Sequence, residues 1–371
     1  MISTMSWEVL PKECVVSKSN RKRYKIKMKG LVLKEDKLLS YEDCENPVVD
    51  SKHNVLVRVL ASGICGSDIG RGFSGKAYHY PLVMGHEFAG EVVSSFSGSA
   101  YQPGDRVAVF PLLPCKKCEA CQTGDFAQCE DYDYYGSRRD GAFAQYVSVP
   151  EENLFRVPDH VDILHAAMTE PAAVALHGVR KAKIAVGSTA VVYGCGPIGN
   201  MVAQWLRISG CARVITVDID SRKLEIAQSM GFEVINSQET DPVQAIYELT
   251  GGRGAHVAVE AVGFPATFLN AIRSVGRMGQ VVFMGNIHGT FQIGEKDFSD
   301  LLRKEITIYG TWNSKVVPTG IDDWSTVLQM MDKELQVDQL ISHTPDLEEG
   351  AEIFNRILKK EEFFNKVIFK V

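Results

Sequence analysis

The residues best suited to metal chemistry stand in two short motifs, Cys65-Gly-Ser-Asp and His86-Glu87. A thiolate and an imidazole are ligands that zinc prefers, and a catalytic zinc keeps three protein ligands and one open position. Glu170 is the expected third ligand, because a carboxylate within the apolar stretch 166–175 requires a cation or hydrogen bonds. Glu87 is a second candidate, either as a ligand or as a group that orients one. The alternative is that Cys65 and His86 are an ordinary core thiol and a core histidine.

Four more cysteines are crowded into one segment, with the spacing Cys115-x2-Cys118-x2-Cys121-x7-Cys129. Four thiolates from one loop complete a tetrahedron with no open position, which is typical of a structural zinc. An iron–sulfur cluster and incidental cysteines are the alternatives. The spacing therefore predicts two zinc ions per subunit, the second of which would hold together a lobe of residues 111–132. Removal of this second zinc is expected to loosen the lobe and not to remove the chemistry directly.

A glycine-rich motif predicts a dinucleotide site. It has the pattern G-x-G-x-x-G and consists of Gly194, Cys195, Gly196, Pro197, Ile198 and Gly199. The motif follows the apolar run 189–193 and opens a helical pattern, so its glycines permit a tight turn and close approach of a pyrophosphate. Asp218 ends the next apolar run, and its carboxylate is expected to accept hydrogen bonds from the ribose and to repel a 2′-phosphate, which favours NAD over NADP. Arg222 is a further candidate for cofactor binding, although a solvated helix residue is the simpler interpretation.

Hydrophobic patterning divides the chain into two kinds of segment. From residue 28 to about 175, short β-rich runs separated by Gly, Pro and Asp predict an irregular, barrel-like β domain. From about 183, apolar strands alternate with helical patterns, which predicts a parallel sheet covered on both faces. The tail after Trp312 is assigned back to the first domain, because six strands of the parallel sheet precede it. Residues 1–27 are rich in basic side chains and are expected to form a solvated or disordered extension.

Composition argues against several classes of function. The 371 residues include 40 basic and 46 acidic side chains, and the net charge of −6 argues against a nucleic-acid partner. No apolar run reaches the length of a membrane span, and the N-terminus lacks the apolar core of a secretory signal. Crowded cysteine pairs in a chain of this size indicate metal binding and reduced thiols, so a cytoplasmic protein is expected.

Three features together resemble the zinc-dependent medium-chain alcohol and polyol dehydrogenases. They are the four-cysteine lobe, the glycine motif and the segment Gly85-His86-Glu87-Phe-Ala-Gly90. The resemblance covers residues 28–371 and implies an α/β protein of two domains. One is a GroES-like, β-rich catalytic domain (28–180 and 312–371), and the other is an inserted Rossmann domain with a doubly wound parallel sheet (181–311).

The same resemblance implies roles for individual residues. Cys65, His86 and Glu170 are the implied ligands of the catalytic zinc, and Glu87 is able to approach the metal. A glutamate as third ligand resembles the sorbitol-dehydrogenase branch of the family. The resemblance also implies a homodimer or a homotetramer.

Two adjacent guanidinium groups predict a site for a phosphate. Arg138 and Arg139 follow the lobe, and arginine binds phosphate through paired hydrogen bonds. The alternative is that they form surface ion pairs with Asp133 or Asp140. Three more residues are candidates for the substrate pocket, or else are ordinary packing and loop residues: Trp312, Asn313 and His288.

The predicted reaction oxidises a secondary alcohol of a polyol phosphate to a ketose phosphate and transfers the hydride to NAD. Ser67 is the expected contact for the hydroxyl proton. Some zinc alcohol dehydrogenases carry a proton-relaying histidine where this chain has Gly70, so water and Glu87 are both open as the next acceptor. The alternatives are a dehydrogenase of an unphosphorylated polyol, such as sorbitol or xylitol, or of threonine, and a non-catalytic sensor that binds zinc and nucleotide. A complete set of candidate ligands favours an enzyme.

Overall fold

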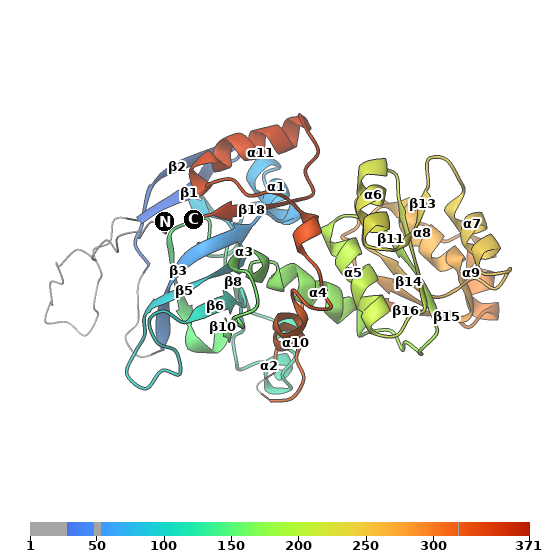
Figure 1. Ribbon diagram of the computed structural model, residues 1–371, viewed down its shortest axis with the longest axis horizontal. Coiled ribbons are helices and arrows are strands. Elements are labelled where there is room, and N and C mark those ends of the chain that lie inside the picture. Colours follow the sequence, from blue (N-terminus) through green and yellow to red (C-terminus); the bar gives the residue numbers. More distant parts are fainter. Residues whose placement is uncertain (1–27, 48–52, 318) are drawn as a thin grey trace, which may run out of the picture.

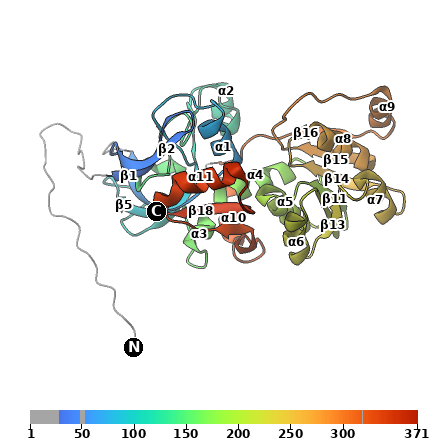
Figure 2. The ribbon, with the colours of Figure 1, turned by 90° about the horizontal axis from the view of Figure 1, so that it is seen from above.

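The structure is a computed structural model, and it describes residues 28–47, 53–317 and 319–371. The extension 1–27 expected from the sequence lies outside the described residues. The chain forms two bodies side by side, one from the N-terminal segments with the C-terminal tail and one from the middle of the chain (Figure 1, Figure 2). In the described ranges, no helix combines the length and the apolar character needed to cross a membrane.

The first body is organised around β3 (Asn54–Gly63), both edges of which are paired. One edge pairs antiparallel with β5 (Glu87–Ser94). The other edge pairs with β9 (Tyr146–Pro150) and then with β18 (Lys366–Lys370), a strand of the C-terminal tail. Since neighbours cover both edges and side chains pack on both faces, seven of the ten residues of β3 are buried.

The remaining elements of this body surround that sheet. The sheet has the order β10-β6-β5-β3-β18-β17, and its outer strands are β6 (Arg106–Val109), β10 (Leu154–Arg156) and β17 (Ile341–His343). A small sheet of order β2-β1-β4 contains β1 (Met28–Glu35), β2 (Leu38–Cys44) and β4 (Leu82–Val83). A two-stranded pair consists of β7 (Leu112–Leu113) and β8 (Asp133–Tyr134). The helices are α1 (Gly66–Phe73), α2 (Glu119–Gln122), α3 (Ile163–Ala166), α4 (Thr169–Val179), α10 (Asp323–Met330) and α11 (Gly350–Lys359). Four short 3-10 turns are η1 (Phe126–Gln128), η2 (Glu151–Asn153), η3 (Asp338–Leu340) and η4 (Leu347–Glu349).

The second body is a parallel sheet of order β13-β12-β11-β14-β15-β16. Its strands are β11 (Thr189–Tyr193), β12 (Arg213–Asp218), β13 (Glu233–Asn236), β14 (Ala255–Glu260), β15 (Val275–Phe283) and β16 (Thr307–Gly310). Its helices are α5 (Pro197–Ile208), α6 (Ser221–Ser229), α7 (Pro242–Leu249), α8 (Pro265–Ser274) and α9 (Glu295–Arg303). In β11, Ala190 and Val192 belong to one core cluster and Val191 and Tyr193 to another, because successive side chains point to opposite faces. Both faces are covered, which explains why this strand is apolar throughout.

The strand order of the second body reverses between β11 and β14. This is the doubly wound arrangement expected from the sequence, and it leaves a crevice beyond the carboxyl ends of the strands where dinucleotides bind. The glycine motif follows β11 directly and opens α5. The motif therefore lies at the reversal point.

The two connections between the bodies meet at one buried carboxylate. Asp323, in the first turn of α10, is 1% exposed and accepts hydrogen bonds from Arg180 Nη1 (2.5 Å) and from the backbone N–H of Lys315 (2.6 Å). His177 Nδ1 lies 2.9 Å from its other side. His177 and Arg180 are at the end of α4, where the chain leaves the first body, and Lys315 is on the return connection from β16. One side chain therefore holds both connections.

Replacing Asp323 with Ala is expected to lower the free energy of unfolding by about 3 kcal/mol, because Arg180 then loses its buried carboxylate partner. Urea denaturation measures the loss. Asp323→Asn keeps the shape and two acceptor positions, so it should cost less. Asp159→Ala, on an exposed turn, is the matched control. If Asp323→Ala costs no more than this control, the carboxylate does not hold the connections.

Candidate active site

Antiparallel pairing brings Cys65 and His86 together. Gly63, at the end of β3, is opposite Glu87, at the start of β5, so residues that follow β3 lie beside residues that precede β5. Cys65 occupies the N-cap of α1, and His86 immediately precedes β5. One ligand atom each of Cys65, His86 and Glu87 lies within 4.8 Å of the other two. These three side chains are thus within reach of a single ion.

Asp68, the last residue of the Cys65 motif, orients both of these ligands. Its buried carboxylate accepts hydrogen bonds from the backbone N–H of Cys65 (3.0 Å) and from Arg71 Nη1 (2.9 Å). It also lies 3.5 Å from His86 Nδ1, without hydrogen-bond geometry. Burial alone would lower the pKa of His86, but the Asp68 carboxylate and the Cys65 sulfur raise it well above its usual value.

This donor set fits a zinc ion. It offers a sulfur, an imidazole and a carboxylate, the ligand types of known zinc sites. His86 Nδ1 is buried and, among the described residues, has no hydrogen-bond partner, while Asp68 stands on its side of the ring. A carboxylate beside the second nitrogen is the usual arrangement for a metal-bound histidine, and it leaves Nε2 for the metal. Asp68 belongs to the Cys65 motif, but its role beside His86 was not predicted from the sequence.

A buried ion pair adjoins the candidate ligands. Lys366, in β18, donates to Glu87 Oε2 and, at 2.9 Å, to the carbonyl oxygen of Ile64. Both charged side chains are almost fully buried, at 5% and 2% exposure. Burial alone would lower the pKa of Lys366, but Glu87 and Cys65 raise it instead. Removal of either partner would leave an uncompensated buried charge, so the C-terminal strand is part of the site.

Glu170 lies beside this group but is not one of the three residues that meet within 4.8 Å. It is in the first turn of α4, and its Oε1 accepts a hydrogen bond from the hydroxyl of Tyr134 (3.1 Å). Burial, with a smaller contribution from Glu87, raises the pKa of Glu170 to about 7 against the opposing effect of His86. The ring of Tyr134 also packs on the ring of His86, with centroids 5.7 Å apart. No pattern in the sequence predicted that Tyr134 would contact these residues.

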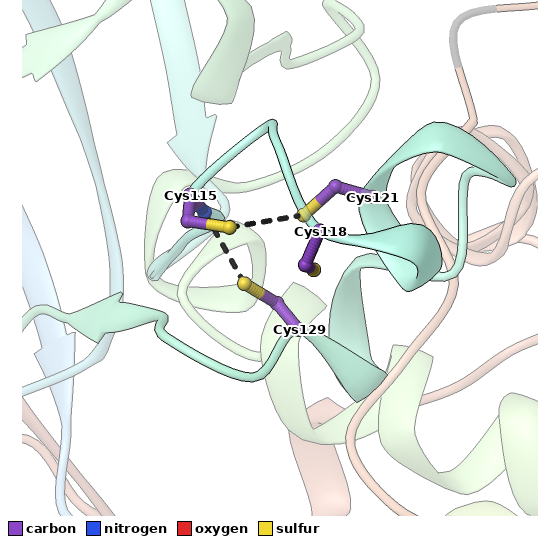
Figure 3. Close-up of side chains that lie close together, drawn as sticks. All are labelled: Cys115, Cys118, Cys121 and Cys129. Atoms are coloured by element: carbon purple, nitrogen blue, oxygen red, sulfur yellow. Dashed lines mark hydrogen bonds between the residues drawn. The ribbon is translucent and has the colours of Figure 1, made fainter.

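The second metal-ligand group is the lobe. All four sulfurs of Cys115, Cys118, Cys121 and Cys129 lie within 4.8 Å of one another. Figure 3 shows the four side chains turned toward a common centre. The backbone N–H of Cys115 donates to the sulfur of Cys129 (3.2 Å), and the sulfurs of Cys115 and Cys121 are 3.9 Å apart.

The lobe is built so that its two ends are held together. β7 pairs with β8, with Leu113 opposite Asp133, and this closes the segment that carries the cysteines. Backbone N–H groups of Glu130 and Cys121 lower the pKa of Cys118 to about 6, because they stabilise its thiolate. Burial raises the pKa of Cys121 to about 12. Four convergent sulfurs, some poised as thiolates, fit a closed structural zinc site.

The cofactor crevice begins at the glycine motif. Gly194 has a φ of 102°, which favours glycine, and a Cβ at Gly199 would collide with the carbonyl oxygen of Gly194. Gly196 is the N-cap of α5, and Pro197 and Ile198 form its first turn. The amide groups at this helix end are therefore open to a pyrophosphate.

Asp218 and Arg222 differ in how free they are to meet a cofactor. Asp218 ends β12, and its carboxylate accepts hydrogen bonds from the backbone N–H of Cys195 (2.7 Å), Ile219 (2.7 Å) and Asp220 (3.0 Å). Since a carboxylate has four acceptor positions, one remains for a ribose hydroxyl. Arg222 instead forms a forked ion pair with Asp220 and is turned over the ring of Phe363.

The structure separates Arg138 from Arg139. Arg139 Nε donates to Asp133 Oδ2 at 2.6 Å, which is one of the ion pairs given as the alternative. The guanidinium of Arg138 lies over the ring of Tyr132 at 4.4 Å and over that of Tyr78 at 5.0 Å. No described carboxylate is within ion-pair distance of Arg138. Arg138 is therefore the cation of this pair whose charge no described carboxylate neutralises.

The other predicted substrate residues are spread over exposed positions. Ser67 is exposed in the first turn of α1. Trp312 is 56% exposed on the connection after β16, and Asn313 follows it with a φ of 57°. His288 is exposed on the loop after β15, where its backbone N–H donates to Gly263. No hydrogen bond or ion pair joins these side chains to the metal ligands in the part of the chain that the structure describes.

Comparison with known proteins defines the class. Residues 51–159 match the family described as alcohol dehydrogenase GroES-like domain, and residues 197–333 match the family described as zinc-binding dehydrogenase. The chain belongs to the zinc-binding medium-chain dehydrogenases. The resemblance stated from the sequence and the expected fold class, a GroES-like domain with a Rossmann domain, are both confirmed.

Individual relatives are named as dehydrogenases of a polyol phosphate and of a polyol. Galactitol 1-phosphate 5-dehydrogenase of Escherichia coli K12 is 33% identical, over 90% of this chain and 97% of its own. Sorbitol dehydrogenase of Bacillus subtilis is also 33% identical, over 90% of this chain and 96% of its own. The crystal structure of galactitol-1-phosphate dehydrogenase from Escherichia coli superimposes with a TM-score of 0.86 at 33% identity, over 92% of this chain and 100% of that chain.

These findings establish the type of activity. The protein is an oxidoreductase that acts on CH–OH groups and uses zinc and a nicotinamide cofactor. The expectation of an enzyme is therefore confirmed against that of a non-catalytic sensor.

Replacing Cys121 with Ser is expected to lower the zinc content from two ions per chain to one, because a closed site needs all four sulfurs. Elemental analysis of the purified protein measures the content, and limited proteolysis should show new cleavage between residues 111 and 132. Cys44→Ser, outside both ligand groups, is the control. Two zinc ions in the Cys121 variant, with an intact lobe, would contradict the assignment.

Proposed function

We propose that this protein oxidises a secondary alcohol of a polyol phosphate, such as galactitol 1-phosphate, to a ketose phosphate with NAD as the acceptor. The observation that carries this proposal is the state of Arg138. Its guanidinium is stacked between Tyr78 and Tyr132, and no described carboxylate neutralises it. Stacking holds the planar fork in place and leaves its edges for a phosphate.

The position of Arg138 relative to the metal ligands supports the same substrate. The ring of Tyr132 packs on that of Tyr134 with centroids 6.3 Å apart, and Tyr134 packs on His86. Two aromatic rings therefore separate the cation from the ligand group. A substrate that bridges them needs its anionic group several atoms from its reacting carbon, as a polyol phosphate has. Fixing the phosphate would determine which hydroxyl reaches the reacting position.

The protein's own groups divide the remaining tasks. Cys65, His86 and Glu87 are the proposed zinc ligands, which gives Glu87 the role expected of Glu170 from the sequence; Glu170 is then a neighbouring carboxylate in the same pocket. When bound, zinc supplies a Lewis acid for the alcohol or carbonyl oxygen. The nicotinamide supplies the hydride acceptor. Ser67, exposed beside Cys65, is the proposed contact for the hydroxyl group.

The onward route of the proton follows from the surroundings of Glu87. Gly70 offers no side chain to relay a proton. Glu87 already accepts a hydrogen bond from the ammonium of Lys366 and is assigned to the metal, so its oxygens are engaged. Water that reaches the exposed Ser67 is therefore the proposed acceptor.

Two observations favour alternatives or additions. The sorbitol dehydrogenase of Bacillus subtilis matches this chain as well in identity as the galactitol 1-phosphate enzyme does, so an unphosphorylated polyol is the second candidate substrate.

We also infer a homodimer that forms through β16, a strand at the edge of its sheet with Ile308, Leu302 and Phe298 exposed at or near it. Open apolar strand edges pair readily, and two copies can pair symmetrically. A light-scattering mass of one chain would exclude this interface.

Replacing Arg138 with Gln is expected to raise the KM for galactitol 1-phosphate by about 10-fold to 100-fold, since a charged hydrogen bond is worth about 1.5–3 kcal/mol. The KM for free galactitol or sorbitol should change much less. Arg139→Gln is the matched neighbour, and its effect should be smaller because Arg139 is paired with Asp133. Steady-state kinetics with NAD and added zinc measure the KM of each variant, and of the wild type, for the phosphorylated and the free polyol. An equal rise for free and phosphorylated polyols would point to an unphosphorylated substrate.

Replacing Asp218 with Ser is expected to lower kcat/KM for NAD and to raise it for NADP. The substitution removes an acceptor for the ribose hydroxyl and a charge that repels the 2′-phosphate. The ratio of kcat/KM for the two cofactors measures the change. Asp220→Ser is a nearby control, since Asp220 is paired with Arg222. An unchanged ratio in the Asp218 variant would remove this residue from cofactor selection.

A further inference from the structure

The lobe that carries the four cysteines borders the pocket around Arg138. The pocket has a volume of about 640 Å³. Arg138 and Tyr78 line one side of it. The lobe supplies most of the other lining residues, which are Leu113, Pro114, Cys115, Lys117, Asp131 and Tyr132. One of these, Cys115, is also a member of the cysteine group.

The charges around this pocket suit an anion. Lys117 comes from the lobe and Arg138 from the segment that follows it. Asp133 also lines the pocket, but Arg139 neutralises it at 2.6 Å. Asp131 is the one remaining carboxylate of the lining. Three cations therefore face two carboxylates, and the excess charge is positive.

The cysteine group determines where Lys117 lies. Lys116 and Lys117 stand between Cys115 and Cys118, and Lys116 adopts a left-handed backbone with a φ of 62°. The two lysine side chains have different surroundings: Lys116 pairs with Glu152, whereas Lys117 lines the pocket. The position of Lys117 therefore depends on the fold of the metal-binding turn.

We propose that the four-cysteine lobe is one wall of the site that binds the substrate's phosphate, with Lys117 as a cationic contact in addition to Arg138. This inference rests on the proposed polyol phosphate substrate. It gives the lobe a part in substrate recognition besides its structural role. It also makes phosphate affinity depend on the integrity of the cysteine group, although no cysteine touches the substrate's reacting carbon.

The test compares two adjacent lysines in the zinc-loaded enzyme. Lys117→Gln should raise the KM for galactitol 1-phosphate about threefold to tenfold, and the inhibition constant of inorganic phosphate by a similar factor. Its kcat and its KM for free galactitol should stay near the wild-type values. Lys116→Gln, which removes only the pair with Glu152, should leave all of these values unchanged. A Lys117 variant with wild-type phosphate inhibition and wild-type KM would overturn the proposal.

A second variant tests the dependence on the cysteine group. Cys121 is buried and does not line the pocket. Cys121→Ser should weaken the binding of inorganic phosphate more than it weakens the binding of NADH. Calorimetry on the folded protein measures both affinities. Equal phosphate affinity in this variant and in the wild type would overturn the dependence.

The outcomes separate this inference from the proposed function. If the wild-type enzyme shows no preference for phosphorylated over free polyols and no inhibition by phosphate, both fail. If the wild type prefers the phosphorylated substrate and responds to Arg138→Gln but not to Lys117→Gln, only the role of the lobe fails.

Discussion

The pairing of both edges of β3 is the constraint on which the active site depends. One edge holds β5, so that Gly63 stands opposite Glu87 and the Cys65 motif lies beside His86. The other edge holds β18, the last strand of the chain, which brings Lys366 to Glu87. The buried carboxylate and the buried ammonium are each tolerable only because the other is present. Strand pairing and charge pairing therefore require each other, and the tail cannot be separated from the catalytic domain.

A single helix connects this site with the rest of the molecule. α4 presents Glu170 to the metal ligands in its first turn and carries His177 in its last turn, where His177 meets Asp323. Between these ends it packs on α5, and the indole N–H of Trp205 donates to the carbonyl oxygen of Ala172. α5 is the helix that the glycine motif opens. Metal site, interdomain connection and cofactor crevice are thus tied to one rigid element.

Aromatic contacts connect the metal ligands with Arg138. Tyr134 reaches Glu170 with its hydroxyl and packs on His86, and Tyr132 packs on Tyr134 and on the guanidinium of Arg138. Both tyrosines come from or next to β8, the strand that closes the lobe. A segment that a metal is expected to hold in place therefore also supports the charged groups that select a substrate.

The amino-acid sequence by itself determined the features whose parts are close together along the chain. The four cysteines of the lobe and the glycine motif are local, because a few residues of backbone suffice to bring their atoms together. The alternation of apolar runs was enough for a parallel sheet covered on both faces. Tertiary structure alone decided the partners that come from distant segments. Lys366 reaches Glu87 across 279 residues, which no spacing rule encodes. Arg138 and Arg139 are equivalent as letters, and only the placement of Asp133 and of two tyrosine rings makes one an ion pair and the other an available cation. The physical reason is that charge, burial and hydrogen bonding depend on what the folded chain brings within a few ångströms of a side chain, whereas the sequence specifies only its immediate neighbours.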